Sequence, residues 1–279
     1  MKITYLGTGA AEGVPALFCN CEYCKGVRAR GGREIRSRAQ LLLDGELSVD
    51  FPPDAFYHAA TLGADLSAIR YLLVTHSHMD HFYAHDFILR GYKYARDLTA
   101  PDLTIVGNRE VLDVFSECTR REMRADVLER IRLREVRPFE SFDLGAYRIH
   151  TLKARHSSRE PLLYLVEKEG KRVLHLTDTG LLPEEDYAFL RSLGGAPFSL
   201  VTLDCTFLWE ESSENARHMG LKENAAVISR LEEIGLVDGN TIKTITHFSH
   251  NSRPAEESLA RAQKVYGFLP AYDGMTVEL

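Results

Sequence analysis

The histidine-rich stretch at residues 75–81 limits most strongly what this chain can fold into. Four candidate metal ligands fall within it: His76, His78, Asp80 and His81. The stretch follows a largely apolar run that is typical of a buried strand, and polar side chains at such a strand end must be hydrogen-bonded or metal-bound, since leaving them unpaired costs about 2–7 kcal/mol. The first two histidines point the same way if the strand continues, and we expect the last two residues to open a helix and face back. The pattern predicts a site for Zn, Mn, Fe or Co.

Length and composition favour one large α/β domain covering residues 1–279. The hydrophobic fraction of 44% and the charged fraction of 27% are ordinary for a globular protein. A net charge of −6 argues against a general polyanion binder. The sequence contains neither an apolar run long enough to span a membrane nor a signal-peptide pattern, so we expect no membrane partner and a cytoplasmic location.

Three of the five cysteines, Cys19, Cys21 and Cys24, crowd into six residues. In a reducing compartment this spacing favours metal binding over disulfides, although three reduced cysteines without metal are the alternative. A closed tetrahedral zinc site needs a fourth ligand. Candidates are Cys118, Cys205 and several histidines, and His250 is the strongest. We therefore predict a structural zinc loop at about residues 13–38.

Apolar runs and turn signals predict strands that alternate with helices along the whole chain. A hairpin is expected at residues 39–50, a helix at 80–96, and a solvated surface segment at 119–137. The arginine-rich segment 28–38 is interpreted as a flexible solvated loop rather than a phosphate contact. This alternation suits a mixed sheet covered by helices.

Further polar residues follow other predicted strands: His156, Asp178, His247 and, closing its own strand, Asp50. Each alone is more often structural, because an aspartate before glycine is usually a turn residue. Their order along the chain makes a shared site the better interpretation.

Together with the pattern at residues 75–81, these residues resemble the motifs of the metallo-β-lactamase superfamily. The resemblance implies a four-layer αβ/βα sandwich, in which two mixed β-sheets are flanked by helices. It also implies two divalent metals at the active site, Mn or Zn, with Fe or Ni as alternatives. One metal would be held by His76, His78 and His156, and the other by Asp80, His81 and His247. Asp178 would bridge both metals, and Asp50 would orient the metal loop as a hydrogen-bond acceptor.

Within that superfamily, the cysteine loop, the arginine-rich segment and the strand-end motifs look like those of the PhnP-type phosphodiesterases of the carbon–phosphorus lyase pathway. This resemblance implies a cyclic phosphodiester or short nucleotide substrate, one structural Zn and a homodimer. It places catalytic roles on Asp80 and on His218, which protonates the leaving oxygen or holds phosphate. The family carries an acidic residue near this histidine, whereas Met219 and Gly220 follow it here.

The leading hypothesis is a metal-dependent phosphodiesterase in which a hydroxide shared by two cations attacks phosphorus in line, while His218 assists the leaving oxygen. Three rivals stay open: an RNA-processing nuclease, a thioester or lactone hydrolase, and a non-hydrolytic metal protein resembling the quinone-cofactor biosynthesis members. The acidic balance and the lack of an obvious tRNA-gripping arm argue against the nuclease, so nucleic acid is not an expected partner beyond cyclic or short nucleotides.

Overall fold

The computed structural model describes residues 1–213 and 215–279, and within them the strands form two seven-stranded sheets. The order of the first sheet is β14 (Met275–Glu278), β1 (Lys2–Gly7), β2 (Gln40–Leu43), β3 (Leu47–Val49), β4 (Tyr71–Leu73), β5 (Leu103–Gly107) and β6 (Ile131–Glu135). The order of the second is β13 (Leu269–Pro270), β12 (Ile242–Thr246), β11 (Leu200–Asp204), β10 (Lys171–Leu176), β9 (Leu162–Lys168), β8 (Tyr147–Lys153) and β7 (Ser141–Leu144). Both sheets mix parallel and antiparallel pairs.

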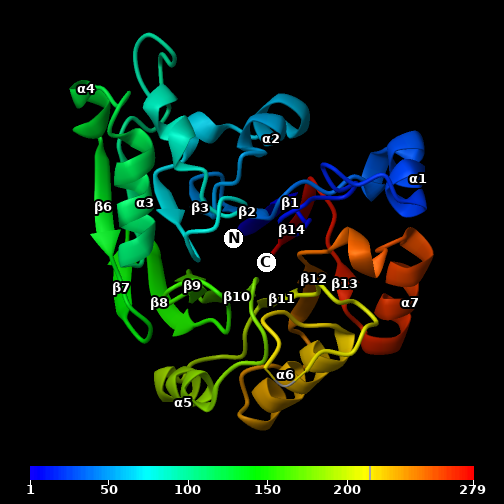
Figure 1. The fold of residues 1–279 in the computed structure, drawn as a ribbon. Coiled ribbons are helices and arrows are strands. Elements are labelled where there is room, and N and C mark those ends of the chain that lie inside the picture. The colour runs from blue at the N-terminus through cyan, green and yellow to red at the C-terminus, as the bar shows by residue number, and fades with distance from the viewer. Residues whose placement is uncertain (214) are drawn as a thin grey trace.

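Helices surround these sheets, as Figure 1 shows. The α-helices are α1 (Glu22–Arg30), α2 (Ala55–Leu62), α3 (Arg109–Thr119), α4 (Ala125–Leu128), α5 (Glu184–Leu193), α6 (Leu221–Glu233) and α7 (Glu256–Tyr266). Short 3₁₀ turns are η1 (Gly32–Glu34), η2 (Leu66–Ala68), η3 (Ala84–Leu89) and η4 (His250–Ser252). No helix within the described ranges is both long and apolar enough to cross a membrane.

Three apolar clusters separate four layers. One packs the two sheets together and contains Tyr5 and Leu43 from the first sheet with Tyr164 from the second. Another packs the second sheet against α5 and α6, and the third packs the first sheet against α3 and η3. The expected four-layer sandwich is therefore confirmed.

Strand β9 illustrates why the sequence produces these layers. Successive side chains of a strand point to opposite faces, and in β9 both faces are apolar. Leu163 and Leu165 enter the cluster beneath α5 and α6, whereas Leu162, Tyr164 and Val166 enter the cluster between the sheets. A strand buried on both faces gives a continuous apolar run.

One prediction of local structure was wrong. The helix expected at residues 80–96 is instead a tight turn followed by the short 3₁₀ turn η3. The histidine cluster and the β-bridge between Phe51 and Phe82 hold the backbone there, and it does not form a regular helix. The segment 119–137 lies mostly exposed on the surface, as expected, and it also contributes the edge strand β6, which pairs in parallel with β5.

The arginine-rich segment was also misinterpreted in part. Arg36 is only 4% exposed, because its backbone bridges to Val14 and its guanidinium lies 4.5 Å above the ring of Phe248. The hairpin at residues 39–50 is confirmed as the antiparallel pair β2 and β3.

Polar residues gather where parallel strands end. In the first sheet β3 is parallel to β4, and in the second β10, β11 and β12 run parallel. Asp50, Asp178 and His247 directly follow or nearly follow three of these strands, with φ of 64°, 62° and 61°. Left-handed backbone is uncommon for such residues and tends to mark functional sites. The carboxyl ends of these strands therefore form the candidate site.

Candidate metal centre

Asp178 is the centre of the strand-end cluster and is 3% exposed. Its Oδ2 lies 3.2 Å from His76 Nε2, 3.0 Å from His81 Nε2 and 3.4 Å from His156 Nε2. Its Oδ1 lies 2.9 Å from His218 Nδ1 and 3.9 Å from His247 Nε2. One buried carboxylate thus contacts five imidazoles that come from distant parts of the chain.

The structure brings both predicted ligand sets together around that carboxylate. The first set is His76, His78, His156 and Asp178, and the second is Asp80, His81, Asp178 and His247. Within each set, one ligand atom of every residue lies within 4.8 Å of those of the others. Asp178 belongs to both sets, as a bridging ligand must. The assignment of each residue as a ligand stays a prediction that this geometry supports.

Hydrogen bonds fix how three of the histidines face the cluster. His81 Nδ1 donates to Asp50 Oδ2 (2.7 Å), and His247 Nδ1 donates to the hydroxyl of Thr206 (2.8 Å). His76 Nδ1 donates to Thr75 (3.0 Å), whose own hydroxyl donates to Asp50. In each ring the proton is held on Nδ1, so the lone pair of Nε2 is presented to the cluster. Metal-ligating histidines are oriented in this way.

The charges and the unpaired atoms of the cluster fit a cation. His247 Nε2 is buried and has no hydrogen-bond partner among the described residues, and His81 Nε2 and Asp178 Oδ1 are buried with only ion-pair contacts to His or Asp atoms of the cluster itself. Burial lowers the pKa of His81, but Asp80, Asp50 and Asp178 outweigh burial and raise that pKa well above its usual value. A buried site that draws positive charge onto an imidazole is one that also favours a metal ion.

Asp50 is itself held by a buried polar chain. Ser48 donates to the Asp50 carbonyl (2.8 Å), Gln40 Nε2 donates to Ser48 (3.0 Å), and His58 Nδ1 donates to Gln40 Oε1 (2.6 Å). Burial lowers the pKa of His58 to about 4, so this ring is neutral at pH 7. The expected role of Asp50 as an acceptor behind the ligands fits these contacts, and His58 lies at the far end of the polar chain that holds it.

Asp204 is a site residue that the sequence interpretation missed. It ends β11 fully buried, accepts from the backbone of Asp178 and Thr206, and lies 3.0 Å from His218 Nδ1. Burial lowers the pKa of His218, but Asp204 and Asp178 together raise it to about 10. Asp204 thus supplies the acidic neighbour that the residues after His218 lack. The signal was present, since a polar residue closes another buried strand.

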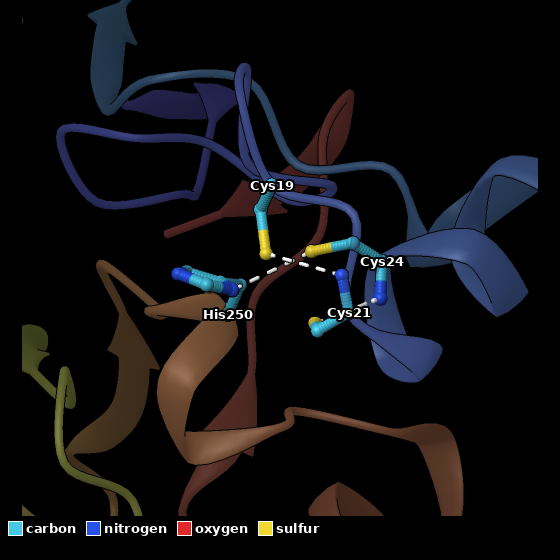
Figure 2. A group of neighbouring side chains, drawn as sticks. All are labelled: Cys19, Cys21, Cys24 and His250. Atoms are coloured by element: carbon cyan, nitrogen blue, oxygen red, sulfur yellow. Dashed lines mark hydrogen bonds between the residues drawn. The ribbon is translucent and has the colours of Figure 1, made fainter.

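Figure 2 shows the second cluster, in which Cys19, Cys21, Cys24 and His250 converge. Cys24 Sγ lies 3.4 Å from His250 Nδ1, and the backbone N–H of Cys24 donates to Cys21 Sγ at 3.5 Å. That N–H is the main cause of the lowered pKa of Cys21, about 6, whereas burial raises the pKa of Cys24 to about 11. Of the fourth ligands considered, His250 is the one that the fold brings to the cysteines.

Glu12 holds the segment that carries one histidine of each cluster and was also missed. Its Oε1 accepts from the Ser249 hydroxyl (2.6 Å) and from the backbone of His250 (3.2 Å). Four residues, 247–250, therefore carry a histidine of each cluster and are fixed by a carboxylate from the loop after β1.

Asp186 supports the segment leading to His156 and gives a prediction about stability. Its Oδ1 accepts from the backbone of Lys153 (3.0 Å), while Oδ2 has no partner in the described part of the chain. Burial raises its pKa to about 7. Because the folded state holds this proton more tightly, stability falls as pH rises from about 4 to 7. We expect Asp186→Asn to remove this pH-dependent loss in the free energy of unfolding, which is on the order of 3 kcal/mol.

Urea unfolding at pH 5 and pH 8 measures the effect, with Glu257→Gln, an exposed carboxylate away from Asp186, as the control. The advantage of Asp186→Asn over the unmodified chain should be larger at pH 8 than at pH 5. If the free energy of unfolding depended on pH equally in Asp186→Asn and in the unmodified chain, the Asp186 carboxyl would have an ordinary pKa and the prediction would fail.

Two facing sheets with a histidine–aspartate cluster at their parallel strand ends define a metallo-β-lactamase fold. The sequence model described as "Beta-lactamase superfamily domain" matches residues 47–265, so the chain belongs to that superfamily. Its members are mostly metal-dependent hydrolases, and the fold implies binding of divalent metal.

Solved structures agree on the fold. A diphosphatase from the PhnP family is 21% identical, with a TM-score of 0.73 over all of this chain and 97% of that one. Zn²⁺-bound PqqB from Methylobacterium extorquens is 16% identical, with a TM-score of 0.75 over the whole of both chains. The short form of human tRNase Z is 16% identical, with a TM-score of 0.69 over all of this chain and 99% of that one. At these identities the likeness shows the fold alone.

A curated relative is the octanoyltransferase of Porphyromonas gingivalis (strain ATCC BAA-308 / W83). It is 23% identical over 270 residues, which is 93% of this chain and 48% of that protein. The chain therefore spans about half the length of the curated relative it matches.

Proposed function

We propose that this protein is a metal-dependent phosphodiesterase that opens small phosphodiesters, cyclic ones in particular. The position of His218 is the main support for this function. Its Nδ1 is anchored between Asp178 Oδ1 at 2.9 Å and Asp204 Oδ2 at 3.0 Å, directly beside the candidate metal ligands. A cationic imidazole next to two bound cations suits an anionic phosphoryl group better than a neutral ester.

Two divalent metals bound here supply Lewis acidity, activation of water and neutralisation of phosphate charge. The residues His76, His78 and His156 would hold one, Asp80, His81 and His247 the other, and Asp178 both. The resembled pattern also gives Asp80 a catalytic role. Asp50 and Thr206 hold the ligand imidazoles in the tautomer that leaves Nε2 available.

His218 holds the proton that the leaving oxygen needs. Its ring is anchored through Nδ1, and in the described part of the chain Nε2 has no hydrogen-bond partner. The side chain is 24% exposed, so part of the ring can meet a substrate. This geometry fits a general acid that protonates the departing alkoxide of a cyclic diester.

Elemental analysis of the purified full chain tests the metal content first. We expect about three metal ions per chain, of which one is a zinc that resists mild chelation. A value near one that added Mn or Zn does not change would rule out the binuclear centre and the hydrolytic function with it.

A substrate panel then tests the reaction. It contains a ribosyl 1,2-cyclic phosphate, a 2′,3′-cyclic nucleotide, a tRNA precursor and an octanoyl thioester, the last chosen because the curated relative is named an octanoyltransferase. We expect kcat/KM for one of the cyclic diesters to exceed kcat/KM for the tRNA precursor and for the thioester by at least about a hundredfold. If the tRNA precursor is cleaved best, the protein is an RNA-processing nuclease, and if the thioester is cleaved best, it is a thioester hydrolase.

We propose in addition that Cys19, Cys21, Cys24 and His250 hold a structural zinc. Cys21 is exposed, so its loss should matter little unless it binds metal. We expect Cys21→Ser to lose that zinc and to lower Tm by about 5 °C or more. Elemental analysis and calorimetry check this, and Cys118→Ser, a free cysteine outside the cluster, should change neither quantity.

A further inference from the structure

A cavity of about 290 Å³ lies away from the strand-end cluster, between the segment 33–36 and helix α7. Figure 1 shows α7 and β13 on one side of the molecule, below α1. An apolar wall is formed by Leu259, Leu269, Pro270 and Ala271. The volume is near the lower end of the range for small-molecule sites, roughly 300–1,000 Å³.

Arg36 lines this cavity and is a buried cation without a close counter-charge. In the described residues no carboxylate oxygen lies within 4.0 Å of its guanidinium, and Nε has no hydrogen-bond partner. Only Nη1 is used, donating to Thr8 Oγ1 (2.9 Å) and to the Ala271 carbonyl (2.7 Å). Buried charges are normally paired, because an isolated ion in the interior loses several kcal/mol of solvation.

The neighbouring carboxylates are engaged by other donors and do not contact Arg36 directly. Glu34 also lines the cavity, but both of its oxygens accept from Arg30, at 2.7 and 2.6 Å. Asp273 accepts from Ser37 and Thr8, and its charge reaches Arg36 only across Thr8. The guanidinium of Arg36 therefore has no anion in direct contact.

The same segment, 33–36, brings a second cation to the cavity. The Arg33 guanidinium lies 4.2 Å from the ring centre of Tyr272, and both residues line the cavity. Arg36 is itself held in place by Thr8, Ala271 and the ring of Phe248. Two ordered guanidinium groups beside an apolar wall form a preorganised site for an anion that carries a small apolar body.

We propose that this cavity binds a small organic anion, a carboxylate or a phosphate monoester, whose charge meets Arg36 and whose apolar part rests on α7 and β13. The site is separate from the metal centre and does not depend on the proposed phosphodiesterase activity. It gives the protein a second ligand beside its substrate.

Isothermal titration of the metal-loaded full chain with hexanoate and with butyl phosphate tests the proposal. We expect one of these anions to bind with Kd of about 1 mM or tighter, and neutral hexanamide to bind at least about tenfold more weakly. Ala260→Phe places a ring at the exposed mouth of the cavity and should weaken anion binding by about tenfold or more. Arg36→Met should do the same.

Two control variants show where on the protein the anion binds. Val265→Phe adds a similar ring on an exposed position of α7 outside the cavity lining and should leave the affinity unchanged. Asp178→Asn should also leave it unchanged, because the metal centre is not involved. The proposal is overturned if neither anion binds at about 10 mM, if binding survives Ala260→Phe, or if it is lost with Asp178→Asn. Ala260→Phe decides the question even if Arg36→Met does not fold.

Discussion

Replacing Asp178 with asparagine is expected to lower kcat/KM for the preferred diester by about a thousandfold or more and to reduce the metal content of the purified chain. The carboxylate lies within 4 Å of five imidazoles and belongs to both ligand sets, so one substitution weakens both metal positions. Steady-state kinetics and elemental analysis of the same preparation measure the two effects.

Asp186→Asn is the matched control, since it changes another buried aspartate outside the ligand sets. It should retain its metal and most of its activity. If Asp178→Asn kept its full metal complement and lost less than about tenfold in activity, a bridging role for this residue would be excluded.

Replacing His218 with asparagine is expected to lower kcat by about 10²–10³-fold while the metal content stays unchanged. The loss should be large for a ribosyl diester, whose alkoxide needs a proton, and small for bis(p-nitrophenyl) phosphate, whose leaving group departs without one. Burial lowers the pKa of His218, but Asp204 raises it above its usual value, so the protonated form is favoured at neutral pH, and activity should fall at alkaline pH. This alkaline limb should vanish in the variant.

His85→Asn, an exposed histidine outside the cluster, is the control and should match the unmodified chain. Asp204→Asn should lower the pKa of His218 and move the alkaline limb to lower pH. An equal loss of rate with both leaving groups would argue that His218 binds the phosphoryl group and does not deliver a proton.

Much of the fold follows from local pattern. Strand β9 is apolar on both faces and was recognisable as a buried strand, and the expected alternation of strands with helices along the chain is confirmed. The chain from residue 80 to 89 was misjudged, because apolar residues at helical spacing also suit a turn that is held by ligand side chains. Arg36 was misjudged because its burial depends on Phe248, which is far away in sequence.

The candidate site could be predicted wherever ligands cluster in sequence or close a strand. His76 and His81 were found by spacing, and Asp178 and His247 by position. Asp204 and Glu12 were missed because the site residues that they contact, His218 for Asp204 and Ser249 and His250 for Glu12, are 14 or more residues away, and only the assembled sheets bring them together. A sequence shows which residue types could bind metal, but not which carboxylate will lie behind which imidazole.

Strand β14 lies beside β1, with Glu278 opposite Lys2. Until β14 is synthesised, β1 is an open sheet edge, and such an edge can pair with another chain. His247 and His250 lie shortly before β14 in the sequence and belong to the two separate metal clusters. Neither cluster can therefore be completed when its earlier ligands, Cys19–Cys24 and His76–His81, leave the ribosome, so metal capture has to wait for the segment 247–250.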